Sequence, residues 1–170
     1  MLYHSPAGTL LISSESGFIT SLVPCAGAAS GSPENEAEKM ADAWLDAYFS
    51  GAPLPSLPPL NPDGTIFQRR VWKCLLDIPR GSVITYGELA ARLDSSARAV
   101  GQAVGANPIA VLIPCHRVVA AGGRLGGFAH GTEMKRALLN LEAKDVSWSL
   151  QQAAEAKRSE AESGESRRLQ

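Results

Sequence analysis

The sequence predicts an α+β protein in two parts, a small strand-and-helix domain over residues 1–50 and a mainly helical domain over residues 64–148. Short strand candidates separated by turns come first, whereas apolar residues at helical spacing dominate the second part. Residues 51–63 hold five of the eleven prolines, at 53, 55, 58, 59 and 62. Such a stretch is stiff and forms neither a helix nor a central strand, so we expect the domain boundary there.

Three strand candidates open the chain, at residues 2–5, 9–13 and 18–23, and a turn with Gly or Pro follows each of them. They predict a small meander. A helix comes next, and we expect Ser32 to cap it, with Pro33 in its first turn. Its apolar residues recur at helical spacing, and we interpret them as core against the meander: Ala37, Met40, Ala41, Trp44, Leu45 and Tyr48.

Two capping-box patterns begin the second part. Thr65 precedes Gln68, and Thr85 precedes Glu88, at the spacing that satisfies the first free backbone N–H groups of a helix. The first pattern predicts a helix that ends at Pro79, and the second predicts a shorter helix.

A turn at residues 94–96, which can cap the next helix, precedes a helix predicted over residues 97–106. Two short helices joined by about three residues are compatible with a helix-turn-helix and equally with an ordinary helical hairpin. The second helix contains Gly101 and Gly105, each of which costs about 1 kcal/mol of helix stability relative to alanine. We therefore expect that close packing against a neighbouring element, or a close approach to DNA, compensates for this loss of helix stability.

The end of the chain contains weaker signals. Residues 118–119 followed by the Gly-containing turn at 121–124 are consistent with a hairpin, and a glycine-rich loop covers 126–131. A last helix is predicted over residues 132–143, and residues 149–170 are predicted to be a polar tail, either a solvated helix or disordered. Three residues define the apolar face of the last helix: Met134, Leu138 and Leu141.

The segment Pro114-Cys115-His116-Arg117-Val118 follows an apolar run at residues 109–113. A cysteine at the end of such a run, with a histidine beside it, is a candidate nucleophile, because a nearby base generates the reactive thiolate. Taken alone, the pair is also compatible with a buried structural cysteine next to a solvent-facing histidine.

Composition limits the cellular setting. The three cysteines, at 25, 74 and 115, show no short metal-ligand spacing, and their odd number favours a reducing compartment. No apolar stretch is long enough to span a membrane, and no signal-peptide pattern opens the chain. We therefore expect a cytoplasmic protein with no membrane partner.

Charge is distributed unevenly along the chain, although the net charge is only −1. Residues 64–144 hold eleven Lys or Arg against five Asp or Glu, whereas residues 1–63 hold one Lys against seven acids. A basic segment inside a neutral chain is expected if only that segment meets phosphate.

Seven stretches between Gly64 and Glu142 make a specific series: 67–72, 78–81, 85–90, 97–101, 107–108, 113–119 and 135–139. They resemble the catalytic domain of the O6-alkylguanine-DNA alkyltransferases, also called methylated-DNA–protein-cysteine methyltransferases. Residues 1–50 resemble the N-terminal domain of that family more loosely. The resemblance implies an RNase H-like first domain and a winged helix-turn-helix second domain.

The resemblance implies a DNA repair protein that flips O6-alkylguanine, mainly O6-methylguanine, out of the duplex. Cys115 would accept the alkyl group, with His116 as its base through a bridging water and Glu142 as the residue that orients His116. The thioether product offers no leaving group that water readily displaces. Each molecule would therefore act once, and no cofactor is implied.

Further residues take their roles from the same resemblance. Asn107 would brace the turn before the cysteine, Tyr86 would hydrogen-bond the flipped base and protonate it, and Arg98 would fill the space that the base leaves. The carbonyls of Cys115 and Val118 would read the amine of guanine. The base contacts would be Tyr86, Val118, Phe128 and Ala129, and the minor-groove contacts would be Ala97, Arg98, Ala99 and Gly101. A monomer bound to double-stranded DNA is implied.

Some members of the family bind zinc in the N-terminal domain, but only His4 and Cys25 are available here, so we expect no metal. Three other hypotheses compete with alkyl transfer. The first is a non-catalytic protein that binds alkyl lesions and recruits other repair factors, against which the presence of Cys115 argues. The others are a helix-turn-helix regulator with a structural Cys-His pair and a cysteine hydrolase.

Overall fold

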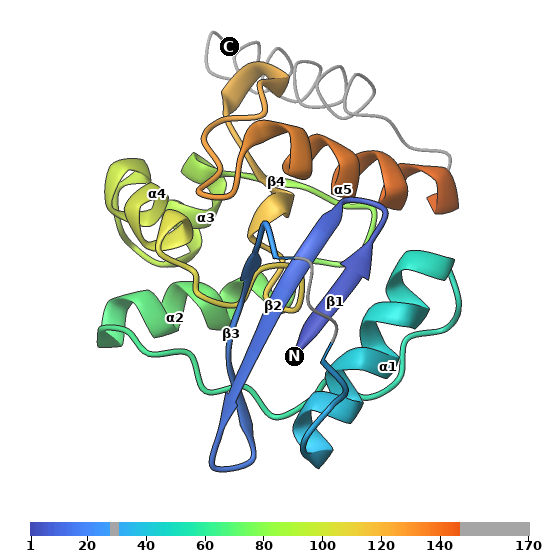
Figure 1. The fold of residues 1–170 in the computed structure, drawn as a ribbon. Helices are drawn as coiled ribbons and strands as arrows, with labels where there is room; N and C mark the ends of the chain where they lie inside the picture. Colours follow the sequence, from blue (N-terminus) through green and yellow to red (C-terminus); the bar gives the residue numbers. More distant parts are fainter. Residues whose placement is uncertain (28–30, 147–170) are drawn as a thin grey trace, which may run out of the picture.

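A computed structural model describes residues 1–27 and 31–146, in which a small N-terminal sheet domain is joined to a helical C-terminal domain (Figure 1). The predicted tail at 149–170, and the end of the predicted second domain at 148, lie outside the described residues. None of the helices in the described part of the chain is long and apolar enough to cross a membrane.

The N-terminal domain is an antiparallel meander covered by one helix. Strands β1 (Leu2–Ser5), β2 (Gly8–Glu15) and β3 (Phe18–Pro24) pair in chain order, which confirms the predicted meander. Helix α1 (Glu36–Ser50) packs against the sheet. Its predicted apolar stripe is buried except for Met40, which is half-buried.

The predicted cap of α1 was wrong. Asn35, not Ser32, caps the helix, because its Oδ1 accepts a 3.0 Å hydrogen bond from the backbone N–H of Glu38. The Asn35 amide also donates to the hydroxyl of Ser14 in β2, and that hydroxyl donates to Glu38. This contact with the sheet favours Asn35 over an equally competent serine and leaves Pro33 outside the helix.

Local capping signals located the helices of the second domain. Thr65 caps α2 (Ile66–Leu75) and Thr85 caps α3 (Tyr86–Arg92), both through complete capping boxes, as predicted. Ser96 caps α4 (Ala97–Gly105), and a short turn joins α3 to α4. The last helix, α5, spans Thr132–Val146.

The predicted hairpin after residue 118 was wrong. Strand β5 (Val118–Val119) pairs in parallel with β4 (Ile84–Thr85), and no strand follows β5 in the described residues. The glycines instead form a 3₁₀ turn, η2 (Ala121–Gly123), where the N–H of Ala120 donates to the carbonyl of Arg124. Both side chains of β5 are buried. The backbone of this short strand is paired with β4, which is distant in sequence.

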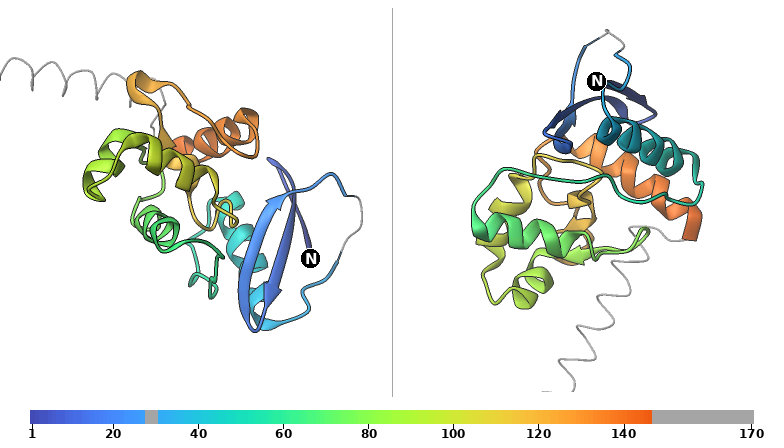
Figure 2. Two further views of the ribbon diagram at one scale, coloured as in Figure 1. Left: turned by 90° about the vertical axis from the view of Figure 1, so that its left-hand side faces the viewer. Right: turned by 90° about the horizontal axis from the view of Figure 1, so that it is seen from below.

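The outer edge of β3 holds two segments of the chain in place. Ile19 exchanges backbone hydrogen bonds of 2.8 and 2.9 Å with Pro59 and Asn61 in the proline-rich segment. Leu22 exchanges two bonds of 2.9 Å with Pro108 and Ala110, just before the candidate nucleophile. The sheet lies at one side of the molecule and α4 at the far side, with this turn between them (Figure 2). The N-terminal domain therefore positions the turn that leads to Cys115.

Candidate active site

The turn that leads to Cys115 is braced from within by Asn107. The buried Asn107 amide donates to the carbonyls of Ile109 and Ile113 at 3.3 and 3.0 Å, and its oxygen accepts from the N–H of Ile109 at 3.0 Å. Val111 in this turn has φ 68°, which is unfavourable for a β-branched residue. The hydrogen bonds of Asn107 stabilise that conformation, which places Cys115 at the start of the 3₁₀ turn η1 (Cys115–Arg117).

The Cys115 thiol is almost completely buried, with 3 % of the residue exposed. Burial raises its pKa to about 11, against opposing effects from a side-chain hydrogen bond with Asn107 and from the charge of Lys135. The free protein therefore holds Cys115 as a thiol near neutral pH, and a base must remove its proton during reaction.

His116 is fully buried and contacts Glu142, with 2.6 Å between Nε2 and Oε1. Burial lowers the pKa of His116 although Glu142 opposes this effect, so we treat the ring as neutral in the free protein. An ionised carboxylate can only accept, so Nε2 carries the hydrogen. Nδ1 is then unprotonated, and it has no hydrogen-bond partner among the described residues. The unshared nitrogen of this ring is therefore a base available to a neighbouring proton.

Glu142 is also completely buried, and Arg117 neutralises its charge. The guanidinium contacts both carboxylate oxygens at 2.9–3.2 Å, and its Nη1 donates to the carbonyl of Ile78 at 2.6 Å. Burial raises the pKa of Glu142, but the hydrogen bond from His116 and the hydrogen bonds and charge of Arg117 outweigh this and hold it well below its usual range. Because Arg117 alone supplies a full positive charge, we take Glu142 as ionised beside a neutral His116.

Lys135 is a buried cation whose charge acts on Cys115. Its Nζ donates to the carbonyls of Val118 and Gly127 at 2.6 and 3.3 Å, and it lies 5.9 Å from the ring centres of Tyr86 and Phe128. Burial lowers the pKa of Lys135 to about 8, with the Cys115 charge opposing this effect. The carbonyl of Val118 is thus already engaged by an ammonium group.

A cleft of about 550 Å³ opens beside this cluster, between α4 and the loop before α5. The half-buried Tyr86 belongs to both regions, because it lines the cleft and a charge on Cys115 adds to burial in raising its pKa. Its hydroxyl donates to the carbonyl of Gly127 at 3.2 Å. The residues lining the cleft are Tyr86, Ala97, Arg98, Gly101, Gly105, Gly127, Phe128 and Ala129.

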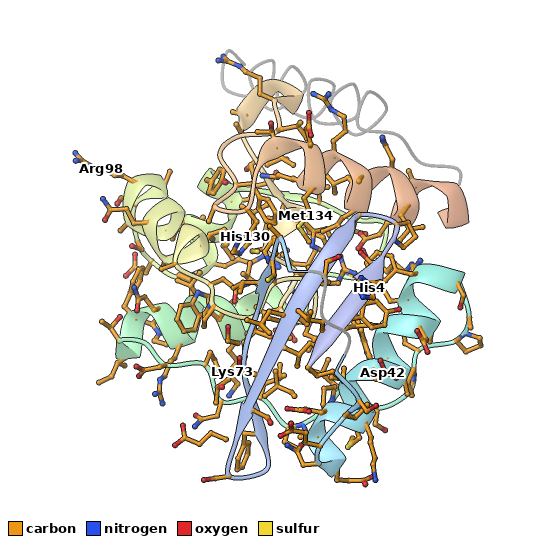
Figure 3. The ribbon with its side chains drawn as sticks, viewed as in Figure 1. His4, Asp42, Lys73, Arg98, His130 and Met134 are labelled. Carbon is orange, nitrogen blue, oxygen red and sulfur yellow. The ribbon has the colours of Figure 1, made fainter. Side chains whose placement is uncertain are left out.

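The structure therefore separates the predicted site residues into two neighbouring groups. Cys115, His116, Glu142 and Asn107 form the buried cluster, whereas most of the predicted DNA contacts and most of the predicted base contacts line the cleft. The side chain of Arg98 is exposed and points away from the molecule at the start of α4 (Figure 3). Val118, which is buried, and Ala99 are not among the residues lining the cleft.

Three buried site residues were missed from the sequence, namely Arg117, Lys135 and Tyr48. For Lys135 a signal exists: with Glu142 it occupies the apolar stripe of α5, where positions i, i+3, i+4 and i+7 are all buried, and opposite charges inside such a stripe suggest a polar cluster. Leu141, which was predicted on the apolar face, is only half-buried. The buried stripe consists of Lys135, Leu138, Leu139 and Glu142.

The two residues considered for a metal make other contacts. His4 lies 3.0 Å from the hydroxyl of Thr9, and Cys25 Sγ accepts from the N–H of Gly27 at 3.3 Å. Within residues 1–27 and 31–143, no group of three or more His, Cys, Asp or Glu side chains is arranged to hold a metal ion.

Two family models match the chain. The 6-O-methylguanine DNA methyltransferase, DNA binding domain, matches residues 66–144. The 6-O-methylguanine DNA methyltransferase, ribonuclease-like domain, matches residues 1–62. Together these matches cover more than half of the chain.

Curated relatives carry the name methylated-DNA–protein-cysteine methyltransferase. The protein of Saccharolobus islandicus is 38 % identical over 145 residues, which cover 85 % of this chain and 95 % of the relative. The protein of Mycobacterium leprae is 47 % identical over 120 residues, or 69 % of this chain and 73 % of the relative. The protein of Methanosarcina mazei is 48 % identical over 104 residues, and the match spans 60 % of this chain and only 66 % of that relative.

Solved structures agree with the sequence matches. The crystal structure of Mycobacterium tuberculosis O6-methylguanine methyltransferase superimposes with a TM-score of 0.75 at 40 % identity, covering 85 % of this chain and 92 % of that one. A structure of Mycobacterium tuberculosis OGT in complex with DNA gives a TM-score of 0.76 at 39 % identity, with the same coverage.

Proposed function

The chain belongs to the 6-O-methylguanine DNA methyltransferase family, and from this premise we propose that it repairs O6-alkylguanine in double-stranded DNA by moving the alkyl group to Cys115. The relatives' printed names and the structure of a relative with DNA support this substrate class. The observation that carries the proposal is the buried contact of 2.6 Å between His116 and Glu142, beside a buried thiol.

Each buried residue has a step in the proposed chemistry. The Cys115 proton passes to Nδ1 of His116 through a bridging water, since Nδ1 makes no direct bond to the sulfur. The sulfur pair then forms a bond to the alkyl carbon while the bond from that carbon to guanine O6 breaks. The electron pair of the broken bond stays on guanine, which takes a proton from the Tyr86 hydroxyl. The His116 imidazolium gives up its proton and the Tyr86 phenolate regains one through solvent, which restores both groups, and the products are a thioether and unmodified guanine.

The carboxylate and the lysine support this proton transfer. Ionised Glu142 stabilises the imidazolium that forms at His116, and the Lys135 ammonium lies where it stabilises the thiolate. No water molecule displaces sulfur from the saturated carbon of the thioether under ordinary conditions. The protein is therefore consumed in the reaction, one alkyl group per molecule.

The cleft fits a nucleotide turned out of a duplex. The target carbon is out of reach inside stacked DNA, so the base must leave the stack, and aromatic faces such as Tyr86 and Phe128 favour an extruded base. Gly101 and Gly105 leave the cleft side of α4 without bulk, which suits a close minor-groove approach, and the exposed Arg98 can occupy the vacated space. We further propose that α3 and α4 act as the helix-turn-helix of a winged domain.

We also propose four features of the whole protein, on the basis of the family and of composition. They are an RNase H-like first domain, domain limits at residues 50 and 64, a monomeric state and a cytoplasmic location. Size-exclusion chromatography and limited proteolysis test the monomer and the limits. One species at the monomer mass and cleavage within residues 51–63 are the expected results.

The proposed reaction is tested by the mass of the intact protein after incubation with a duplex that contains O6-methylguanine. Wild-type protein should gain the mass of one methyl group, and Cys115→Ser should gain none. Binding of the modified duplex without a mass gain would favour a lesion-binding protein, and an absence of lesion preference would favour a regulator. Repeated turnover of an ester or amide would favour a hydrolase.

A further inference from the structure

The N-terminal domain reaches the buried cluster through Tyr48. This residue lies in the last turn of α1, its side chain is fully buried, and its hydroxyl donates a 2.7 Å hydrogen bond to Oε1 of Glu142. The two residues are 94 positions apart in sequence. The apolar stripe of α1 predicted a core residue here, so the contact with a carboxylate is a property that only the folded chain shows.

Tyr48 and His116 share one carboxylate oxygen. An ionised carboxylate only accepts hydrogen bonds, so both the tyrosine O–H and the Nε2–H of His116 point at Oε1. The tyrosine oxygen also lies 3.5 Å from Nε2, which is long for a hydrogen bond. With its proton directed at Glu142, Tyr48 presents no donor to Nε2. The ring of His116 therefore keeps its hydrogen on Nε2 and its lone pair on Nδ1.

The Tyr48 hydroxyl is itself fixed in place. Arg80 donates a 2.9 Å hydrogen bond to the backbone carbonyl of Tyr48, and its guanidinium lies 4.5 Å from the centre of the ring. The ring also stacks on Trp44 at 5.3 Å between centres. Burial, followed by the charge of Glu142, raises the pKa of Tyr48 well above its usual range. The hydroxyl thus remains a donor near neutral pH.

We propose that Tyr48 is a positioning residue for the His116 base, because its hydroxyl holds Oε1 of Glu142 and so fixes the ring with Nδ1 free for the Cys115 proton. The proposal rests on the alkyl-transfer function and deepens it. The N-terminal domain supplies a part of the proton relay in addition to holding the turn at Pro108 and Ala110.

Tyr48→Phe tests the proposal, because it keeps the packed ring and removes the hydroxyl alone. Tyr3→Phe is the matched control: Tyr3 is also a buried N-terminal tyrosine that donates to a carboxylate, Asp46 at 2.8 Å, away from the cluster. Two rates are measured against pH in the full chain: methyl transfer from the O6-methylguanine duplex, and alkylation of Cys115 by iodoacetamide, followed by the mass of its peptide. The second needs no DNA.

Tyr48→Phe should lower both rates about tenfold at neutral pH, as expected for a lost hydrogen bond to a charged group. It should also move the midpoint of both pH profiles upward and leave duplex affinity unchanged. Tyr3→Phe should behave as wild type. Unchanged rates and midpoint in Tyr48→Phe, or an equal loss in Tyr3→Phe, would overturn the proposal.

The two rates test alkyl transfer and the positioning role of Tyr48 separately. If wild-type protein gains no methyl group while Tyr48→Phe still shifts the iodoacetamide profile, alkyl transfer is wrong and the positioning role stands. Should Tyr48→Phe not fold, the ¹⁵N NMR spectrum of His116 in the wild-type protein shows which ring nitrogen carries the hydrogen. A ring protonated on Nε2 alone supports the proposal, and a ring protonated on Nδ1 overturns it.

Discussion

Cys115 and His116 form a neutral pair in the free protein. The motif suggested that the histidine holds the cysteine as a thiolate, but burial raises the thiol pKa to about 11 and lowers the pKa of the imidazole. Two buried charges without a substrate would cost more than their attraction returns. In the proposed reaction, the ion pair therefore forms only as the alkyl carbon arrives.

Lys135 is predicted to set how readily Cys115 loses its proton. Its charge favours the thiolate, so Lys135→Met should raise the thiol pKa and slow iodoacetamide alkylation of Cys115 at pH 7 by up to about tenfold, the effect of one pKa unit. The Lys135 pKa of about 8 fixes the sign of the pH dependence. Wild-type Lys135 loses its charge above that pH, so the difference between the two proteins should shrink as pH rises.

Lys73→Met is the control for this measurement, because Lys73 is an exposed lysine of α2 in the same domain (Figure 3). It should react like wild type at every pH. A Lys135→Met protein that folds normally and is alkylated as fast as wild type at pH 7 would show that Lys135 only anchors the carbonyls of Val118 and Gly127.

Helix α4 retains glycines where packing within the chain does not demand them. A methyl group at Gly105 would meet nothing within 4 Å, and one at Gly101 would make ordinary contact with Tyr86 at 3.7 Å. The expected compensation for these helix-weakening residues is therefore not found in the described part of the chain. Both face the cleft, which supports an approaching duplex as the reason for their small size.

Gly101→Ala should therefore stabilise the protein and weaken its binding to DNA. The free energy of unfolding, measured with urea, should rise by about 0.5–1 kcal/mol, because alanine favours a helix over glycine. Duplex affinity, measured by fluorescence anisotropy, should fall because the added methyl group occupies the cleft. Gly87→Ala in α3 provides the comparison: it lies outside the cleft and has room for the methyl group, so stability should rise there without loss of affinity. Equal affinities would contradict the role given to α4.

Elements with local signals were predictable, and elements that depend on distant partners were not. Thr65, Thr85 and Ser96 begin their helices as expected, because a capping side chain acts within three residues. The cap at Asn35 depends on Ser14 in the sheet, and β5 depends on β4, more than thirty residues earlier. Neither dependence leaves a local pattern.

The residues of the candidate site also differ in whether a local sequence pattern predicts them. The motif itself drew attention to Cys115 and His116, and only a family resemblance drew attention to Glu142, which alone would be taken for a solvated carboxylate. The structure shows it fully buried and bonded to Arg117. Tyr48 carries no signal at all, since an interior tyrosine at helical spacing fits a core as well as a site.

At the scale of the whole molecule, the two domains share one continuous set of buried side chains. The edge strand β3 holds the turn before Cys115 through backbone hydrogen bonds, and α1 supplies Tyr48, whose hydroxyl contacts the carboxylate of Glu142. Residues 1–63 hold one Lys against seven acids, so the contribution that we infer for the N-terminal domain is to the geometry of the buried cluster.

The buried cluster predicts that the protein is sensitive to acid. The folded-state pKa of His116 lies below its ordinary value of 6.5, so the unfolded chain takes up a proton first and stability falls as pH drops below that value. The pKa of Glu142 lies below its ordinary value of 4.5, so its contribution is present above that value and is lost on further acidification. The half-buried His130 acts in the same direction as His116.

Urea unfolding between pH 7.5 and pH 4 measures this sensitivity. The free energy of unfolding should decline from about pH 6.5 downward, and the decline above pH 5 should be shallower in His116→Gln, which has no imidazole to protonate. A stability that stays constant across this range in wild type would contradict the neutral, buried state of His116.

We propose that one alkyl group is transferred irreversibly from DNA to Cys115. The most direct measurement incubates the protein with a large excess of O6-methylguanine duplex and follows restored guanine together with the mass of the Cys115 peptide. Restored guanine should reach a plateau at one per protein molecule, and every methyl group should be found on Cys115. Continued repair beyond that plateau, or a methyl group on any other residue, would contradict the proposal.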